Sequence, residues 1–497
     1  MTVKKTEKTK SHSKLASEIA NTFEWLTIAF ILAFVFRAFV MEAYRIPTGS
    51  MADTLMGAHF DIRCIQCGYA YQYGANSTGK GYVEPEPSKC PSCGFYQSTG
   101  GNMSVSNGDR ILVLKCLYPF QDPKRWDVVV FKNPLEPSIN YIKRLVGKPG
   151  ETVEIINGDI YINGDIARKP AKAQEELWMP VYDNDYTPAR PTQGNFNGHF
   201  WQRPFDIQNS KWSVKPELPT NFYLDSTADE ISYLKYDRSI GNDFRVTYAY
   251  NDVRDFPYQP YCSDLLVKFY VNTENQAGLA GAQITKYDTS YKAEYNFSGQ
   301  MTISSQKDGK MMELTALPVS PVKINSTFAL SFAVVDHQLI FKAGSETLKY
   351  DLGKKADALG PRNGEIAPEL SILGAGKMTL SHVSVFRDIY YTEKKFVSSE
   401  KGGRAIEGNP LTLKEDQFFV LGDNSPNSED CRWWSKPGIK NNGGQYDEGT
   451  VPRDYLVGKA MLVYWPSGFK LFAGFPFAII PNVGKIRFIY GGSDKSL

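Results

Sequence analysis

An apolar segment close to the N-terminus places the strongest constraint on how this chain can fold. Its uncharged part runs from Trp25 to Phe36, and with Arg37 and the apolar residues that follow it extends over residues 22–41. A helix of that length measures about 30 Å at about 1.5 Å per residue, which matches the hydrocarbon thickness of a membrane. Arg37 lies near one end, where its long stem can carry the charge to the headgroups. We therefore expect a transmembrane anchor over residues 22–41.

The residues before this segment are basic and predict its orientation. Against one acid, Glu7, residues 1–14 carry Lys4, Lys5, Lys8, Lys10 and Lys14. By the positive-inside rule, residues 1–21 form a cytoplasmic tail and everything after residue 42 lies outside. Two other interpretations are open. A cleaved signal peptide fits the basic start and the length of the apolar core, but no A-x-A site follows that core in this sequence. A buried helix would have no need of a lysine tail.

Length and composition predict more than one domain and much β structure. At 497 residues the chain is long for a single hydrophobic core. Its 29 Tyr, 29 Phe, 41 Gly and 29 Pro favour strands joined by many turns. The net charge of +2, from 56 basic and 54 acidic residues, gives no reason to expect a nucleic-acid partner.

Short β-branched runs separated by turn signals occur in two distant parts of the chain. They include "DRILVLKCLYPF" and "RWDVVVFKNP" before residue 170, and "DQFFVLGDN" and "YLVGKAMLVYWP" after residue 400. Between them lie strands at hairpin spacing, such as "SDLLVKFYVNT" and "TFALSFAVVDHQLIFKAG", a pattern that suits a β-sandwich. We predict a mainly β protein in which one β core is interrupted by a large β-sandwich insertion.

The predicted boundaries divide the chain after the anchor into five parts. The core takes residues 42–63, 105–170 and 401–497, a cysteine-bearing insertion takes 64–104, and the sandwich takes 171–400. Near the C-terminus, "LFAGFPFAIIPNV" (471–483) is apolar but too short to span a membrane. We expect it to form a buried strand or a patch that faces the membrane.

Four of the seven cysteines form two C-x2-C pairs. The stretches "CIQCG" and "CPSCG" are separated so that 22 residues lie between the pairs. Paired knuckles of this kind, each followed by glycine, resemble a zinc ribbon. The resemblance implies a structural zinc ion held by Cys64, Cys67, Cys90 and Cys93. Two disulfides are the alternative, and the expected location outside the membrane favours them.

Four stretches carry the chemistry of this chain: "PTGSMADTL" (47–55), "GDRILVLK" (108–115), "YIKRLVGKPGE" (141–151) and "GDNSPNSEDCRWW" (422–434). Read alone, Ser50 and Asp53 fit the capping box that opens a helix. In this order after an N-terminal anchor, the four stretches resemble type I signal peptidases, the Ser/Lys proteases that cut signal peptides from exported proteins. The resemblance covers residues 22–170, apart from the cysteine segment, and residues 408–470. It does not extend to the sandwich.

The resemblance implies that Ser50 is the nucleophile and Lys143 the general base. A serine hydroxyl is a poor nucleophile until a neighbouring base takes its proton. A lysine in water has a pKa of about 10.4 and is protonated, so a lysine base must be desolvated. Ile142 before it and Leu145 after it suit that need. Without the other motifs, an exposed strand lysine would be the ordinary interpretation.

Other positions match supporting residues of the family. Thr48 stands where a hydroxyl forms the oxyanion hole together with the Ser50 backbone N–H. Ser428 matches the serine that orients the lysine ammonium group. Asp430 and Arg432 match the pair that holds the same loop; by themselves they would be a turn with a surface ion pair.

The resemblance also implies the substrate and the compartment. Positions that match the lining of shallow apolar pockets for small substrate side chains are Tyr44, Ile46, Met51, Leu55 and Ile142. Taken without the family, they would be core residues. The implied substrates are exported preproteins of the Ala-x-Ala type, cut without a catalytic cofactor by a single-pass protein of the plasma (inner) membrane. Its catalytic domain would lie against lipid on the outer (periplasmic) face.

Three departures from the family pattern leave other functions open. Asp53 replaces a usual proline, Ser425-Pro426 replaces Arg-Asp, and Cys431 replaces a serine; Pro426 in particular would alter the backbone of its loop. An anchored binding protein with a degenerate core is one alternative, and a related Ser/Lys processor with a dedicated substrate is another. Residues 171–400 resemble concanavalin-type or laminin-G-type sandwiches, which implies a glycan or protein ligand, although a spacer is equally open.

Overall fold

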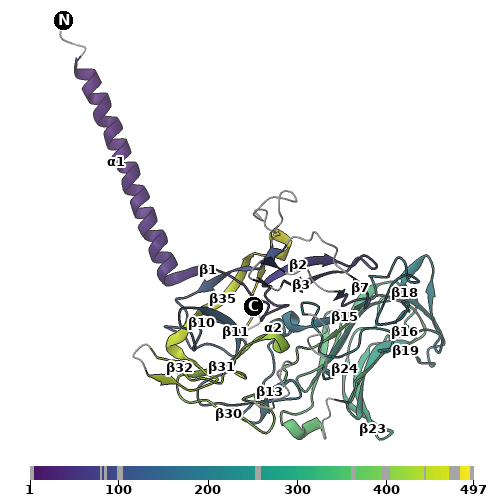
Figure 1. Ribbon diagram of the computed structural model, residues 1–497. Helices are drawn as coiled ribbons and strands as arrows, with labels where there is room; N and C mark the ends of the chain where they lie inside the picture. Colours follow the sequence, from purple (N-terminus) through teal and green to yellow (C-terminus); the bar gives the residue numbers. More distant parts are fainter. Residues whose placement is uncertain are drawn as a thin grey trace.

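The computed structural model is mainly β, as the sequence predicts, with one long helix that projects from the body (Figure 1). It describes residues 5–75, 77–78, 81–82, 87–97, 105–251, 259–359, 365–393, 403–440, 444–468 and 482–492. The apolar stretch 471–483 therefore lies outside the described residues, apart from its last two positions.

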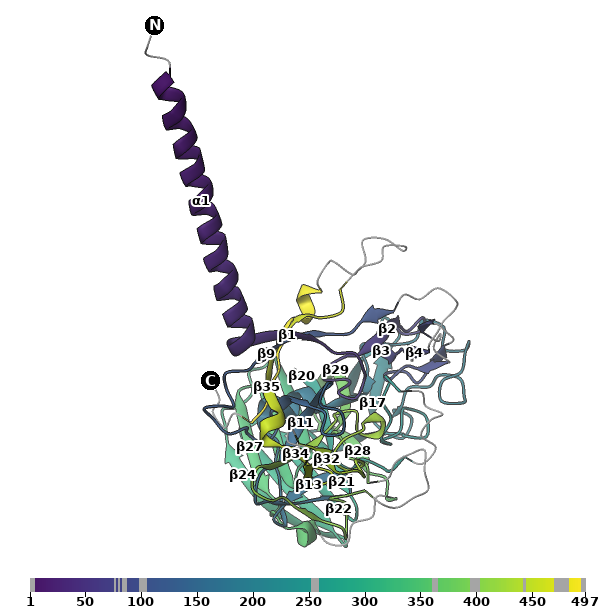
Figure 2. The same ribbon diagram turned by 60° about the vertical axis from the view of Figure 1, so that its left-hand side comes forward.

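The projecting helix is α1 (Lys5–Val35), which continues as a π-helical turn, η1 (Phe36–Val40). Residues Ser17–Val40 are long and apolar enough to cross a membrane, and none of this stretch is buried against the body (Figures 1 and 2). The Thr22 and Thr27 hydroxyls donate to carbonyls one turn earlier, at 2.8 Å each, so neither is left unpaired in an apolar surrounding. Among the described residues, no other helix has these properties.

The core sheet begins where the helix ends. Met41 is extended, with φ −148° and ψ 139°, and opens the first strand. The pairings are antiparallel, in the order β1 (Met41–Arg45), β9 (Arg110–Leu114), β35 (Leu456–Trp465), β10 (Val128–Lys132), β11 (Asn140–Gly147), β31 (Gln417–Leu421), β34 (Val451–Pro452), with β36 (Arg487–Phe488) paired to β35. Strands from both ends of the chain alternate in this order, so the core sheet forms only when the chain returns from the 171–400 region.

Smaller elements surround the core sheet. A four-stranded sheet contains β14 (Asp165–Ile166), β13 (Asp159–Ile162), β12 (Thr152–Ile156) and β30 (Leu411–Thr412). The other short elements are α2 (Ala171–Leu177), β32 (Gly438–Ile439), β33 (Gln445–Tyr446), η3 (Ala356–Leu359), η4 (Ser425–Asn427), η5 (Arg453–Tyr455) and η6 (Val483–Lys485).

The cysteine segment forms short antiparallel strands beside the core. A three-stranded sheet contains β3 (Ala70–Gly74), β2 (Ala58–Arg63) and β8 (Ser106–Asn107). Two hairpins complete it, β6 (Ser88–Lys89) with β7 (Tyr96–Gln97) and β4 (Ser77–Thr78) with β5 (Gly81–Tyr82). Strand β2 begins at Ala58, before the predicted start of this segment at residue 64 and only a few residues after Ser50.

Residues 179–387 form two antiparallel sheets that share one hydrophobic cluster. The first contains β17 (Trp212–Lys215), β18 (Leu218–Asp225), β29 (Lys377–Arg387), β20 (Leu265–Thr273), β25 (Thr327–Val335), β26 (Gln338–Ala343) and β27 (Glu346–Asp351), with β15 (Met179–Asp183) paired to β29. The second contains β16 (Phe205–Asp206), β19 (Ser232–Tyr236), β28 (Glu369–Ala375), β21 (Leu279–Lys286), β22 (Thr289–Asn296), β23 (Gln300–Lys307) and β24 (Lys310–Pro318). Buried residues such as Phe269 in β20 and Ala293 in β22 alternate with more exposed ones, which is the pattern of a sandwich.

A cluster of charged side chains joins the sandwich to the core, and we call Asp159, Lys169, Asp264, Lys286, Asp336 and Asp388 the junction cluster. Lys169, on the chain leaving the core, pairs with Asp336 at 2.5 Å and Asp388 at 2.9 Å, and Lys286 pairs with Asp264. Burial raises the pKa of Asp388 to about 7 and that of Asp159 well above its usual range. Four acids and two lysines share this small volume, so the carboxylates cannot all be ionised together.

Candidate active site

Strand β11 places a buried lysine against the serine that follows β1. Lys143 is 4% exposed, and its Nζ donates to Ser50 Oγ at 2.7 Å and to the Ile142 carbonyl at 3.0 Å. Alternation along the strand sends Ile142 to the opposite side, into a different apolar cluster from that of Tyr141 and Leu145. Two residues separated by 93 positions in sequence thus meet in one hydrogen bond.

The surroundings of Lys143 favour the neutral amine. Burial lowers its pKa to about 8, while the carboxylates of Asp430 and Asp423 act in the opposite direction. The Tyr141 ring lies 5.4 Å from Nζ. A lysine with this pKa has a substantial neutral fraction near physiological pH, unlike a lysine in water.

Hydrogen bonds to its carbonyls hold the turn that carries Ser50. The Gly49 carbonyl accepts from the Ala52 N–H and from Asn424 Nδ2, both at 3.0 Å, and the Ser50 carbonyl accepts from the Asn424 N–H at 3.1 Å. In the described part of the chain, neither the Thr48 hydroxyl nor the Ser50 N–H has a hydrogen-bond partner, and Thr48 is exposed. Both donors predicted for an oxyanion hole are therefore unpaired in the described part of the chain.

The 422–434 loop is fixed by a fully buried ion pair. Arg432 donates to both oxygens of Asp430, at 2.8 and 2.7 Å, and neither side chain is exposed. The same guanidinium donates to the Ser425 hydroxyl and to the Thr392 carbonyl, each at 2.7 Å. Asp430 in turn accepts from the Gly422 N–H at 3.0 Å. The pair therefore lies inside the protein, unlike the surface pair that the two residues alone would suggest.

Ser428 lies beside the Ser50 turn, and its hydroxyl makes no hydrogen bond to the Lys143 amine. Its hydroxyl is buried and has no hydrogen-bond partner among the described residues. It packs against Gly422, where an added Cβ would come within 2.2 Å of Ser428 Oγ and 2.5 Å of the Ser50 carbonyl oxygen. The expected contact between Ser428 and Lys143 therefore stays a prediction.

The three sequence departures are accommodated. Ser425 accepts from Arg432 and from the Thr392 N–H at 2.8 Å, and Pro426 lies in the short helical turn η4, which tolerates proline near its start. Cys431 is buried, its sulfur accepts from the Val420 N–H at 3.2 Å, and burial raises its thiol pKa well above the usual range. Asp53 lines a small cavity together with Arg387.

The five predicted pocket residues lie in one apolar cluster next to Ser50. Ile46, Met51 and Leu55 are buried, and the partly buried Tyr44 and Ile142 pack against them. Val128 and Val130 of β10 close the same cluster. The arrangement brings these residues together from three segments of the chain.

Several residues at this site were not predicted from the sequence. Arg144 and Asp423 form a second buried bidentate pair, at 2.8 and 2.7 Å. Asn424 binds the Ser50 turn, as described above. Tyr248, Tyr250 and Asn251 reach the site from the sandwich region. Arg144 and Asp423 lie inside the quoted stretches 141–151 and 422–434, so pairing the opposite charges of these two stretches could have found them.

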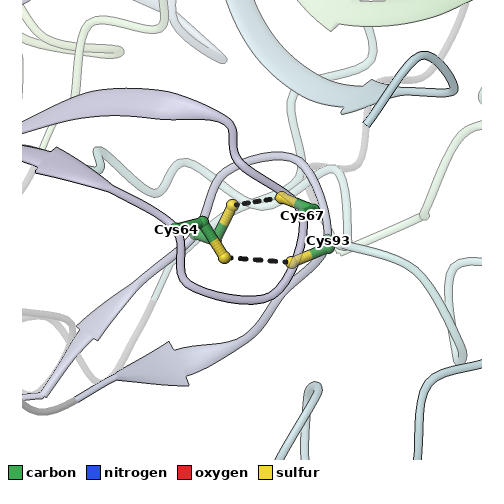
Figure 3. Close-up of side chains that lie close together, drawn as sticks. Cys64, Cys67 and Cys93 are labelled. Carbon is green, nitrogen blue, oxygen red and sulfur yellow. Dashed lines mark hydrogen bonds between the residues drawn. The ribbon is translucent and has the colours of Figure 1, made fainter. Parts of the chain in front are cut away.

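The four clustered cysteines converge as predicted (Figure 3). The Sγ atoms of Cys64 and Cys93 are 3.7 Å apart, as are those of Cys67 and Cys90, and all four lie within 4.8 Å of one another. A disulfide needs an S–S distance of about 2.05 Å. Four thiolates around zinc at about 2.3 Å would be about 3.8 Å apart. The spacing fits a tetrahedral metal site.

The buried Lys143 amine thus lies against the Ser50 hydroxyl, beside two donors that have no partner among the described residues. The family model described as "Signal peptidase, peptidase S26" matches residues 93–211 and 377–465. Signal peptidase I of Rickettsia rickettsii is 30% identical over 253 residues, covering 50% of this chain and 80% of that protein. Signal peptidase I of Rickettsia conorii is 25% identical over the same length and coverage. The chain belongs to the signal peptidase I family.

One solved structure resembles part of this chain distantly. A carbohydrate binding module, CBM66 from Bacillus subtilis, shares 8% identity and aligns with a TM-score of 0.25. The alignment covers 37% of this chain and 95% of that module. A TM-score of this size supports no conclusion about the sandwich region or its ligand.

The buried Asp430–Arg432 pair makes a prediction about stability. Replacing Asp430 with alanine leaves the Arg432 guanidinium buried without its carboxylate. We expect Asp430→Ala to lower the free energy of unfolding by about 3 kcal/mol, because removing one partner of a buried pair is costly. Urea denaturation measures this. The control is Lys211→Ala, which breaks an exposed pair with Glu230 and should cost less than about 1 kcal/mol. An equally small change in both variants would contradict the prediction.

Proposed function

We propose that this protein is a membrane-anchored serine endopeptidase that removes signal peptides from exported preproteins, cutting after small residues. The observation that carries the proposal is the 2.7 Å hydrogen bond from the buried Lys143 amine to the Ser50 hydroxyl. Family membership supplies the class of substrate, and the Ala-x-Ala preference rests on the resemblance of the site residues.

The proposed reaction has two halves. Neutral Lys143 takes the proton of Ser50 Oγ as that oxygen attacks the scissile carbonyl carbon, and the protonated lysine then gives a proton to the leaving amine. The new ester links Ser50 to the signal peptide. Water, deprotonated by Lys143, attacks this ester, the bond to Ser50 Oγ breaks, and the lysine returns the proton to that oxygen as the peptide leaves with a free carboxylate. In both halves the Thr48 hydroxyl and the Ser50 N–H donate to the oxyanion.

Substrate choice would come from the apolar cluster beside Ser50. Ile46, Met51 and Leu55 are already tightly buried there, which leaves little volume for a substrate side chain. Small residues such as alanine would fit, and bulky residues would be excluded by overlap. Tyr44 and Ile142 are partly exposed and would line the accessible side.

The helix that contains Ser17–Val40 would anchor the protein, with its basic tail in the cytoplasm and the catalytic domain on the outer face of the plasma membrane. Ser50 follows the end of this helix by ten residues. A preprotein held by its own signal peptide in the same bilayer would present its cleavage site at a similar height. Shared tethering raises the effective concentration of the two reacting groups.

We also propose a structural zinc on Cys64, Cys67, Cys90 and Cys93. The four sulfurs would fill all coordination positions, which leaves no place for substrate and separates the metal from the reaction. The ion would hold together the short strands β2, β3, β6 and β7. A glycan or protein ligand for the sandwich stays a hypothesis.

The assignment of nucleophile and base makes the first prediction about activity. Full-length protein in lipid should cleave a preprotein with an Ala-x-Ala site, and Ser50→Ala and Lys143→Ala should each lose at least about 1000-fold in kcat/KM. The matched controls are Ser138→Ala and Lys148→Ala, whose side chains are solvent-exposed and outside the site. Both controls should keep wild-type activity. Full cleavage by Lys143→Ala would remove the mechanism, and no cleavage by the wild type would favour a binding protein with a degenerate core.

The pKa of Lys143 predicts how the rate depends on pH. Only the free amine can take the serine proton, so kcat/KM should rise about tenfold per pH unit at low pH and level off above about pH 8. Rates measured from about pH 6 to about pH 10 test this. A plateau reached only above about pH 10, the range of an ordinary lysine, would show that the amine is not desolvated.

The zinc proposal is tested by composition. Elemental analysis of the purified protein should find about one zinc per chain, and Cys67→Ser should reduce that content sharply. Cys116→Ser is the matched control, because Cys116 is free and outside the cluster. Absence of zinc together with absence of reactive thiols among the four cysteines would establish disulfides instead.

A further inference from the structure

A short segment of the sandwich region reaches into the peptidase site. Tyr248, Tyr250 and Asn251 are each less than a tenth exposed, and all three bind residues outside the sandwich. The Tyr248 hydroxyl donates to the Asp423 carbonyl at 3.2 Å, and the Tyr250 carbonyl accepts from the Gly74 N–H at 2.8 Å. This segment thus touches the 422–434 loop on one side and the cysteine segment on the other.

Asn251 fixes the side chain that holds the Ser50 turn. Its Nδ2 donates to Asn424 Oδ1 at 2.7 Å, and Asn424 Nδ2 donates back to Asn251 Oδ1 at 2.8 Å. Asn424 has no exposed surface, so this reciprocal pair determines how its amide is oriented. In that orientation Asn424 Nδ2 also reaches the Gly49 carbonyl at 3.0 Å, while its backbone N–H binds the Ser50 carbonyl.

Tyr250 supports the same turn from another direction. Its ring lies between two glycines: a Cβ added to Gly49 would come within 1.9 Å of the ring, and one added to Gly74 within 2.4 Å. Its hydroxyl donates to the Ala58 carbonyl at 2.8 Å, which fixes the ring in place. The ring also lines a cavity of about 460 Å³ together with Thr48 and Asn427. Tyr250 therefore sets the position of Gly49, the residue directly before the serine.

We propose that Asn251 and Tyr250, both supplied by the inserted sandwich, are positioning residues for Ser50. The proposal rests on the proposed function, since it assigns them to the same peptidase site. Both contacts converge on Gly49 and, through Asn424, on the Ser50 carbonyl, so they control where Ser50 Oγ lies relative to Lys143. A displacement of about 1 Å at a reacting group can cost about 100-fold in rate. The sandwich is on this account a part of the catalytic apparatus.

The test uses full-length protein in lipid with a preprotein substrate. Asn251→Asp keeps the side-chain shape but replaces the donor to Asn424 with an oxygen. We expect kcat to fall at least about tenfold with KM changed less than about threefold, because the nucleophile is misplaced while the substrate pockets are intact. Tyr250→Ala should show the same fall in kcat. Tyr250→Phe keeps the ring and should therefore keep most of the wild-type kcat. The controls are Asn272→Asp and Tyr270→Phe, on the outer face of the sandwich.

A double-mutant cycle separates positioning from general destabilisation. If Asn251 acts through Asn424, then Asn251→Ala combined with Asn424→Ala should reduce kcat hardly more than Asn424→Ala alone. Additive losses, or kcat within about twofold of wild type in both Asn251→Asp and Tyr250→Ala, would overturn the proposal. Those outcomes leave the proposed function intact as long as wild-type protein cleaves and Ser50→Ala does not. Failure of wild-type cleavage would instead remove the proposed function itself.

Discussion

The exclusion of water from one amine is the condition on which this site depends. Lys143 can serve as a base only while its charged form is disfavoured, and its 4% exposure is what lowers its pKa to about 8. The nearby carboxylates of Asp430 and Asp423 oppose that shift. Each of them is paired with an arginine, Arg432 and Arg144 respectively, so that neither acts on the lysine as an uncompensated charge. The two buried ion pairs therefore stabilise the loop and also limit how far the lysine is re-protonated.

The same loop links the two halves of the peptidase core. Ser50 and Lys143 come from the first half of the chain, and the residues that hold them come from the last hundred residues. Asn424 connects these parts by binding the Ser50 turn and the sandwich segment at once. The site is thus assembled from three regions that are far apart in the sequence.

Sequence alone predicted the mainly β fold, the apolar helix and the residues that meet at the site. Ser50 and Lys143 could be paired because their motifs resemble a family, and the cysteine spacing predicted the convergence of four sulfurs. Other features could not be predicted, because they depend on contacts between residues far apart in the sequence. Whether Asp430 and Arg432 lie inside or outside the protein depends on their contacts with Thr392 and Ser425. Thr392 is distant in the sequence, and Ser425 stood out only as a departure from the family pattern. Asn251 has no local pattern, because its importance comes from a contact 173 positions away. The helix ends at Val40, one residue before the end of the predicted anchor at residues 22–41, because Met41 pairs with Leu114 in the core sheet.

The junction cluster has a consequence for how such a protein can evolve. Lys169 leaves the core, but Asp336 and Asp388, which neutralise it, belong to the sandwich. A gene rearrangement that removed the sandwich would leave the Lys169 ammonium group without its carboxylate partners. Removing the partners of a buried charge costs several kcal/mol. The buried charge of Lys169 therefore makes the core depend on the sandwich. A version of this protein without the sandwich would need an uncharged residue in place of Lys169 to keep its core equally stable.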